Sequence, residues 1–282
     1  VDLTKCDVVF FATPHGVAMA QAPALLAAGV KVIDLAADFR LKDQAKFEQW
    51  YKIPHTAPEL IEQAVYGLPE LNREDIKQAK LIANPGCYPT TMQLGFYPLL
   101  KAGLVNAGGL IADCKSGVSG AGRKAEIGIL FSESSDSFKA YGVAGHRHLP
   151  ETTAQLQRFT DEKVALTFTP HLVPMNRGIL ATCYAQPASD GLRTADVLDC
   201  LADFYRDEPF VVVDERSPST KATLGSNTAH LTARVDERTG TVVGIGAIDN
   251  LGKGAAGQAI PNANLMLGLP ESTGLPVNGV AP

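Results

Sequence analysis

The chain has 282 residues, enough at ~150 residues per domain for about two domains with buried cores. A hydrophobic content of 45% and a charged content of 20% exclude a disordered chain. The net charge of −5 comes without a block of Lys or Arg, which argues against a nucleic acid or a membrane surface as partner. No apolar run reaches the ~18 residues of a membrane span.

The first residues predict a βαβ unit with parallel strands. Strands are expected at 7–12 and 30–35, with a helix at 18–28 between them. Residues 39–80 contain three prolines and predict short helices and loops. A third short strand is expected at 81–83, followed by a helix after Thr90 and therefore by an α/β arrangement.

The second half of the chain has a different pattern. A helix is expected at 193–205, with Thr194 as its N-cap, and another at 251–269. Strands and helices that do not alternate indicate an α+β domain with a largely antiparallel sheet. The expected strands lie within 108–118, 163–173, 178–187, 229–237 and 241–250.

The number and spacing of the cysteines argue against metal-binding, redox-pair and disulfide roles. Five is an odd number, and no two cysteines form a CxxC pair, so zinc-ribbon and thioredoxin-like sites are excluded. A disulfide scaffold does not fit this density either, and a reducing cytoplasm is the expected compartment. The cysteines are Cys6, Cys87, Cys114, Cys183 and Cys200.

Cys87 is the strongest candidate for a reactive thiol. It follows a predicted strand and Pro85-Gly86, at the mouth of a predicted helix. A helix N-terminus stabilises a thiolate and can bind an oxyanion through its backbone N–H groups. The simpler alternative is a buried structural cysteine, which is the interpretation that we give to the other four.

His146 and His148 are the candidate bases for this thiol. They flank Arg147 in a loop bounded by Gly145 and Pro150, which is a polar pattern that a core does not need. A solvated loop is the alternative. A metal site has little support, because no third ligand has a clear spacing.

Three other segments carry glycine beside charge. Gly120-x-Gly122-x-x-Ala125 matches a dinucleotide fingerprint on paper, but no βαβ unit surrounds it, and a flexible ligand-binding loop or a surface turn fits better. Arg177 lies between two apolar strands, where it either grips a carboxylate or extends to the solvent at a sheet end. Residues 248–256 end a strand in a glycine-rich turn that brings backbone close to a flat ligand or to a packed helix.

Five motifs together resemble the N-acetyl-gamma-glutamyl-phosphate reductase family of arginine biosynthesis, which is related to the aspartate-semialdehyde and glyceraldehyde-phosphate dehydrogenases. The resemblance covers essentially the whole chain. The motifs are NPGCYPT at 84–90, SGVSGAGRKA at 116–125, GHRHLPE at 145–151, PHLVPMNRGILATC at 170–183 and DNLGKGAAGQA at 249–259.

The resemblance implies a Rossmann-type NADP-binding domain and an α+β catalytic and dimerisation domain with a mostly antiparallel sheet. It divides the chain into an N-terminally incomplete dinucleotide-binding domain (1–86), the catalytic domain (87–248) and a C-terminal helix that returns to the first domain (249–282). Pro261 is expected to interrupt that helix. A homodimer or homotetramer is expected on the same basis.

Site roles are also implied by the resemblance. Cys87 corresponds to the nucleophile and His146 to the acid/base, with His148 next in line. The substrate contacts implied are Asn84, Ser119, Gly120, Arg123 and Arg177, and the cofactor contacts implied are Thr13, Pro14, His15, Gly16, Asn250, Gly252, Lys253 and Gly254.

The expected reaction is NADPH-dependent reduction of N-acetyl-L-glutamyl 5-phosphate to N-acetyl-L-glutamate 5-semialdehyde. A thiolate displaces phosphate from the acyl phosphate, and the thioester that results accepts a hydride. The alternative substrates are N-acetyl-aminoadipyl phosphate, a carrier-protein-linked analogue and aspartyl phosphate.

The chain departs from the family at its start. The family's first strand–loop–helix, with its Gly-x-x-Gly-x-x-Gly cofactor loop, does not occur in the 282 residues. We therefore expect a further βαβ unit of roughly 60–75 residues before Val1 in the natural chain. The missing loop leaves a non-catalytic dimeric binding module as the alternative from another class.

Overall fold

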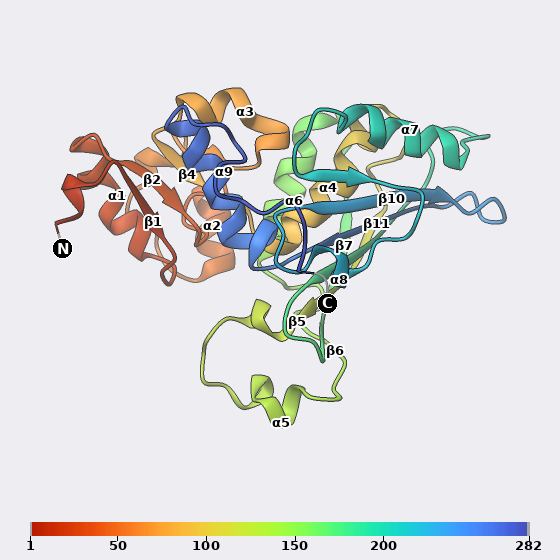
Figure 1. The fold of residues 1–282 in the computed structure, drawn as a ribbon, viewed down its shortest axis with the longest axis horizontal. Coiled ribbons are helices and arrows are strands. Elements are labelled where there is room, and N and C mark those ends of the chain that lie inside the picture. Colours follow the sequence, from red (N-terminus) through yellow and green to blue (C-terminus); the bar gives the residue numbers. More distant parts are fainter. Residues whose placement is uncertain (1, 281–282) are drawn as a thin grey trace. The chain divides into compact units, whose positions relative to one another are not determined.

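A computed structural model of the chain describes residues 2–280, which form two compact units. Unit 1 contains the chain up to Gly86 together with Ala255–Leu275. Unit 2 contains Cys87–Gly254 and the residues from Pro276 on. Figure 1 shows the elements in the colours of the sequence. Among the described residues, no helix has both the length and the apolar character to cross a membrane.

Unit 1 is built on a parallel sheet with the strand order β1-β2-β4-β3. The expected strands and the helix between them are confirmed to within a residue or two, whereas β3 was not predicted. The elements are η1 (Leu3–Lys5), β1 (Val8–Phe11), α1 (Val17–Ala27), β2 (Lys31–Asp34), α2 (Gln44–Tyr51), η2 (Pro58–Leu60), β3 (Val65–Tyr66), α3 (Pro69–Gln78), β4 (Leu81–Ala83) and α9 (Gly257–Met266).

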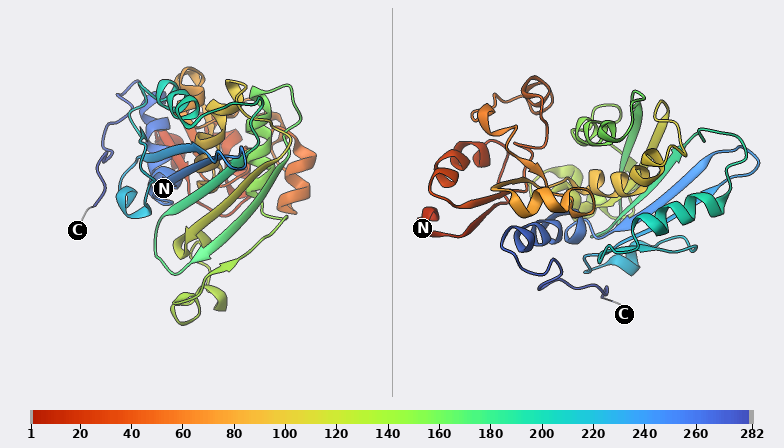
Figure 2. Two further views of the ribbon diagram at one scale, coloured as in Figure 1. Left: turned by 90° about the vertical axis from the view of Figure 1, so that its right-hand side faces the viewer. Right: turned by 90° about the horizontal axis from the view of Figure 1, so that it is seen from above.

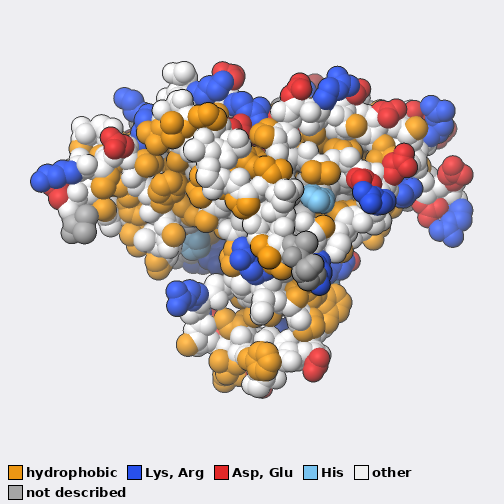
Figure 3. All heavy atoms as spheres, in the orientation of Figure 1, with side chains coloured by type: hydrophobic (Ala, Val, Ile, Leu, Met, Phe, Trp, Pro, Cys, Tyr) orange, Lys and Arg blue, Asp and Glu red, His pale blue; other side chains and the backbone are white. Residues whose placement is uncertain are grey.

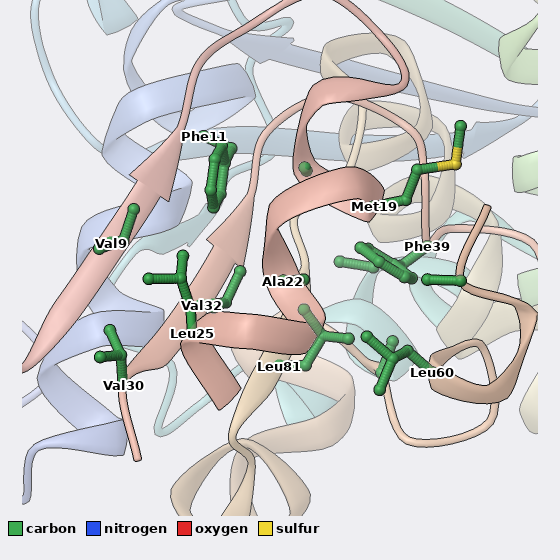
Figure 4. Close-up of a cluster of buried hydrophobic side chains, with 14 of the residues drawn as sticks. Val9, Phe11, Met19, Ala22, Leu25, Val30, Val32, Phe39, Leu60 and Leu81 are labelled. Atoms are coloured by element: carbon green, nitrogen blue, oxygen red, sulfur yellow. The ribbon is translucent and has the colours of Figure 1, made fainter. Parts of the chain in front are cut away.

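Both faces of this sheet are buried, which explains the nearly continuous apolar strands. On one face Val9, Phe11 and Val32 pack against Met19 and Leu25 of α1 (Figure 4). On the other face Ile33 and Ile82 share a core with α3 and α9, which supply Ile76, Ala259 and Ala263. The last helix of the chain therefore completes the core of unit 1.

Unit 2 contains a seven-stranded mixed sheet with the order β6-β7-β5-β8-β11-β10-β9. Four of its pairings are antiparallel and two are parallel, so the expected largely antiparallel sheet is confirmed. The strands are β5 (Leu110–Gly117), β6 (Lys139–Ala140), β7 (Leu166–Val173), β8 (Ile179–Ala185), β9 (Val211–Val213), β10 (Ala229–Val235) and β11 (Val242–Ile248).

The helices of unit 2 include one that covers this sheet. Strand β8 alternates buried and half-buried residues, and its buried Cys183 faces α4, where a Cβ at Gly95 would lie 3.8 Å from its Sγ. The helical elements are α4 (Cys87–Lys101), η3 (Val118–Ala121), η4 (Ile127–Ile129), α5 (Phe131–Ser134), α6 (His148–Leu156), η5 (Gln157–Phe159), α7 (Thr194–Phe204) and α8 (Thr220–Thr223).

Three details differ from the predictions. Helix α4 begins at Cys87 and not after Thr90, because Pro89 is tolerated in a first turn, where backbone N–H groups have no helical partner. The N-cap of α7 is Arg193, because the Thr194 hydroxyl accepts the N–H of Val235 instead. The final helix starts as a π-helical turn over Gly252–Ala256 and then continues through Pro261 as α9.

Candidate active site

Cys87 is the first residue of α4 and is half-buried. Strand β4 ends four residues earlier, at Ala83, and the Pro85-Gly86 turn leads directly into the helix. The thiol therefore lies at the positive end of a 15-residue helix, where a thiolate is stabilised. The buried Cys114 and Cys183 differ, because burial raises the pKa of each thiol, for Cys183 to about 12.

Gly254 packs directly against Cys87 within unit 2. A Cβ at position 254 would lie 2.9 Å from the Cys87 Cβ and 3.1 Å from the Cδ1 of Ile248. Gly252 is equally confined, since its Cβ would lie 2.5 Å from the carbonyl oxygen of Ser226. The glycine-rich turn predicted as a ligand contact thus has a packing reason for both glycines.

An aromatic cluster surrounds the residue that follows the thiol. The ring of Tyr88 lies 5.7 Å from the ring of His146 and 6.0 Å from that of His148, between centroids. The Tyr141 hydroxyl donates to the Tyr88 hydroxyl over 3.2 Å, and the Tyr88 hydroxyl donates to the carbonyl oxygen of His171 over 3.1 Å. Both predicted histidines are thus brought to the start of α4.

The two imidazoles have different surroundings. The Nδ1 of His146 accepts the backbone N–H of His148 over 3.1 Å, so the neutral ring carries its proton on Nε2. Burial, and then the nearby Arg147 charge, lower the pKa of His146 to about 4. His148 is the first residue of α6, and its ring lies 4.7 Å from that of His146.

Tyr88 and Tyr141 are part of this cluster, although neither was among the predicted site residues. Burial raises the pKa of Tyr141 to about 12 and that of Tyr88 further, so both phenols stay protonated. The signal available was position alone, since Tyr88 follows the candidate thiol and Tyr141 precedes the histidine loop. Among the described residues, no group of three or more His, Cys, Asp or Glu is arranged to hold a metal ion.

Arg177 is held by a buried carboxylate. Its Nη2 lies 2.8 Å from the Oδ2 of Asp249, and its Nε donates to Oδ1 over 3.2 Å. Asp249 is fully buried and also accepts the N–H groups of Gly225, Leu251 and Gly252. The ion pair uses two of the five guanidinium donors and fixes the plane of the rest, while the Arg177 side chain remains 38% exposed.

Asn250 connects two of the predicted loops from inside unit 2. Its Nδ2 donates to the Ser119 hydroxyl over 3.0 Å, and its Oδ1 accepts the N–H of Gly178 over 2.7 Å. The side chain is 2% exposed, so it positions the Ser119 loop beside Arg177 and offers no surface to a cofactor. Beyond this anchored loop, Gly120 and Arg123 are exposed.

Two further predicted contacts are placed differently by the structure. The Lys253 side chain is fully buried, with its Nζ 5.5 Å from the centroid of the Phe210 ring, and gives a cofactor no exposed surface. Asn84 is 1% exposed inside unit 1, where its Nδ2 donates to the carbonyl of Ala255 and its Oδ1 accepts from Asn262. Asn84 therefore ties β4 to α9 instead of presenting its amide to a substrate.

The carboxyl edge of the unit 1 sheet carries the first predicted cofactor segment. Thr13 and Pro14 are exposed after β1, and His15 is half-buried with its ring against Tyr51. Gly16 has a φ of +94°, which suits glycine, and its N–H donates to the carboxylate of Asp38. The buried Asp38 also accepts the N–H of Met19, so the N-terminus of α1 already has an anion of its own.

Comparisons with known proteins agree with this architecture. Residues 1–79 match the semialdehyde dehydrogenase NAD binding domain, and residues 87–250 match the semialdehyde dehydrogenase dimerisation domain. Aspartate semialdehyde dehydrogenase II from Vibrio cholerae, solved in complex with ASA, has a TM-score of 0.73 at 18% identity and matches 95% of this chain and 81% of its own. The fold and the site thus define an oxidoreductase of the semialdehyde dehydrogenase class.

Curated relatives narrow the assignment. N-acetyl-gamma-glutamyl-phosphate reductase from Herminiimonas arsenicoxydans is 59% identical over 275 residues, which is 97% of this chain and 79% of the relative. The protein of that name from Bordetella pertussis is 58% identical over 284 residues, covering 99% of this chain and 80% of the relative. The chain belongs to the N-acetyl-gamma-glutamyl-phosphate reductase family.

Proposed function

We propose that this chain reduces N-acetyl-L-glutamyl 5-phosphate to N-acetyl-L-glutamate 5-semialdehyde, with NADPH as the reductant and Cys87 as the nucleophile. The observation that carries the proposal is the position of Cys87 as the first residue of α4, with two histidines packed around the neighbouring Tyr88. The family to which the chain belongs supports the choice of substrate and of cofactor.

The thiol of Cys87 forms the covalent intermediate. The Cys87 thiolate attacks the acyl carbon, the C–O bond to phosphate breaks, and a thioester and inorganic phosphate are formed. The N-terminal N–H groups of α4 stabilise both the thiolate and the tetrahedral oxyanion, because they point to the same end of the helix. When bound, NADPH supplies the hydride that reduces this thioester, and the aldehyde then leaves Cys87.

Proton transfer is better assigned to His148 than to His146. The hydrogen bond from the His148 backbone occupies the Nδ1 of His146 and opposes its protonation, and burial keeps this ring neutral above pH 4. His146 then acts as a donor through Nε2–H, which can stabilise an oxyanion without releasing the proton. We assign the general acid/base role to His148, two residues further along the chain, whose ring lies 4.7 Å from that of His146.

We assign Arg177 and the loop around Ser119 to binding the negatively charged groups of the substrate. Asp249 fixes the guanidinium so that its remaining N–H groups bind a carboxylate or phosphate in one plane. The Ser119 hydroxyl, held by Asn250, and the exposed Gly120 and Arg123 complete the proposed anion-binding segment.

The residues after β1 fit a nicotinamide dinucleotide. Thr13 and Pro14 are exposed at the carboxyl edge of a parallel sheet, and the Thr13 hydroxyl is a donor there. We assign Thr13–Gly16 to NADP contacts, with Gly16 contributing backbone shape because its N–H is bound to Asp38. From the second segment we retain the backbone of Gly252, which is partly exposed, and Gly254 as the packing partner of Cys87.

The family match bears on the assembly, and the cysteines bear on the cellular compartment. We propose a homodimer or homotetramer formed through unit 2, supported by the match of residues 87–250 to a dimerisation domain. We also propose a reducing cytoplasm as the compartment, because the chain has an odd number of cysteines at a density too low for a disulfide scaffold.

Replacing Cys87 with Ser tests the mechanism. We expect NADPH oxidation with N-acetylglutamyl phosphate to fall at least ~10³-fold, because a hydroxyl is a far weaker nucleophile at neutral pH. NADPH binding, followed by fluorescence, is expected to stay within about twofold. Cys6→Ser, at another half-buried cysteine, is the matched control and should retain activity. Near-wild-type turnover of Cys87→Ser would refute the thioester mechanism, and a substrate panel with aspartyl and N-acetyl-aminoadipyl phosphates tests the substrate.

A further inference from the structure

Residues 121–145 form a segment of unit 2 without a core of its own, here named the arm. It contains η4, α5 and β6, and none of its 25 residues is buried. Figure 1 and the left view of Figure 2 show it as a long loop that extends beyond the end of β5 and carries α5. Its backbone hydrogen bonds join residues at most four apart, except where β6 and Tyr141 pair with β7.

The arm nevertheless carries large apolar side chains toward the solvent. Phe131 is 86% exposed, Ile127 is 76% exposed and Phe138 is 60% exposed. With Leu130 and Val143, the arm holds five of the fourteen exposed large hydrophobic residues found among residues 2–280. Hydrophobic side chains also gather over this segment in Figure 3. An apolar concentration of this kind marks a surface that is covered by a partner.

The charges of the arm favour a second copy of the same chain as that partner. Between Arg123 and Lys139 the arm has three basic and three acidic residues, so it is neutral overall and its charges can pair with those of an identical segment. The two Phe rings alone offer roughly 150–250 Å² each. With the other apolar side chains and a two-fold repeat, this approaches the ~800 Å² per partner of a stable interface.

The body of unit 2 next to the arm can receive such side chains. A hollow of about 350 Å³ lies beneath the arm, lined by Val118, Ile129, Phe131 and the loop of Pro174 to Asn176. Strand β6 also connects the arm to the edge of the seven-stranded sheet, whose side facing away from α4 includes Ile111 at 43% exposure. Strand β6 thus places the arm at the edge of this sheet.

We propose that the arm is an exchanged contact between two copies of this chain and that this contact orders both sides of the candidate active site. Its first residues follow Ser119, which Asn250 holds, and its last residues lead through Tyr141, which donates to Tyr88, to His146. This second part rests on the proposed function. A copy that grips the arm fixes the Ser119 loop and the histidine loop at once, because both are its ends.

Two charged substitutions test the contact. Ile127→Glu with Phe131→Glu should weaken self-association by about 100-fold or more, measured by sedimentation velocity over a wide range of protein concentrations. The matched control is Leu267→Glu with Leu269→Glu, at two apolar residues of unit 1 that are 42% and 46% exposed, and it should associate like the wild type. Neither change touches a buried side chain, and circular dichroism with urea unfolding verifies that both variants fold.

Hydrogen exchange in the arm separates the remaining outcomes. In the wild type, amides 126–138 should be protected at high protein concentration and lose that protection on dilution. Concentration-independent protection would mean that the arm docks within its own chain, and unchanged association of the arm variant would mean that it is no interface; either result overturns the proposal. If the wild type associates through the arm but does not turn over an acyl phosphate, the proposed function has failed and the contact stands.

Discussion

Gly254 leaves no space for a side chain beside Cys87. A methyl group there would lie 2.9 Å from the Cys87 Cβ and 3.1 Å from Ile248, so the start of α4 or the 249–254 turn must move. Gly254→Ala is therefore expected to cost about 1–3 kcal/mol of unfolding free energy and to lower kcat more than KM. Urea unfolding and steady-state kinetics measure the two effects. Gly109→Ala, where a Cβ would meet nothing within 4 Å, should change neither.

His146 makes the folded state sensitive to acid. Burial lowers the pKa of this imidazole from 6.5 to about 4. At a pH between 4 and 6.5 the imidazole is therefore mostly protonated in the unfolded chain and mostly neutral in the folded chain. Its contribution to stability is complete above pH 6.5 and is lost as the pH falls toward 4. We expect wild type to lose on the order of 1–2 kcal/mol more than His146→Asn between pH 7 and pH 4.5, by urea unfolding.

The same comparison can contradict this account. The asparagine oxygen can still accept the backbone N–H of His148, so the loop keeps its hydrogen bond. All other groups titrate in both chains, and the difference between them isolates the imidazole. Parallel stability curves for the two proteins would show that His146 is not buried in its neutral form.

Site residues were predictable where their side chains would be unusual in a hydrophobic core. A cysteine behind Pro-Gly and two histidines in a glycine-bounded loop were recognised, and the structure packs both imidazoles against Tyr88, the residue after the cysteine. Asn84, Asn250 and Lys253 were also recognised, yet their side chains point into the protein. A motif gives the residue and its place on the chain, but the direction of a side chain depends on contacts with segments far away in sequence.

At the scale of elements, Asp38 determines how α1 begins. Helix α1 starts without a side-chain cap from Gly16, and the buried Asp38 carboxylate instead accepts the N–H groups of Gly16 and Met19. Asp38→Ala should cost about 2–4 kcal/mol, because it leaves buried helix N–H groups without an acceptor. Asp43 caps α2 from an exposed position with one N–H, that of Lys46, and Asp43→Ala should cost only about 0.5–1 kcal/mol.

Urea unfolding of the two alanine variants is the measurement. Equal losses for Asp38→Ala and Asp43→Ala would mean that burial adds nothing to the capping interaction. The result also bears on the cofactor assignment, since an α1 terminus that depends on Asp38 cannot offer the same N–H groups to a phosphate.

Most of the longer elements were predictable because their patterns are strong. Helix α6 was missed, because Gly145 and Pro150 suggested a loop around the two histidines. Strands β1, β2 and β4 are short apolar runs, and β8 alternates between its faces. The strands that were missed are β3, β6 and β9, of two or three residues each. Such strands exist because a neighbouring strand offers hydrogen bonds, and that information is not local. The start of α4 was misplaced because Pro89 resembles a helix breaker outside a first turn.

For the whole molecule, the length and the change of pattern near residue 108 suggested two units, and the resemblance implied boundaries after residues 86 and 248. The two compact units of the structure change at Gly86 and again at Gly254. Composition cannot locate the return of the chain to unit 1 after Gly254, because nothing in a Gly/Ala-rich helix indicates which sheet it packs against. The resemblance implied that a C-terminal helix returns to the first domain, and the contacts of α9 with Ile33, Ile76 and Ile82 give the packing that the sequence could not.

The discontinuity of unit 1 has a consequence for synthesis on the ribosome. Its strands emerge first, but Ala259 and Ala263, which cover one face of the sheet, are translated more than 170 residues after β4. Residues Cys87–Gly254 leave the exit tunnel after β4 and before α9. They can therefore fold while the sheet of unit 1 still lacks the helix that covers one of its faces. The nascent chain therefore exposes Ile33 and Ile82 for most of its translation, and this is the interval in which a chaperone that binds apolar strands would be needed.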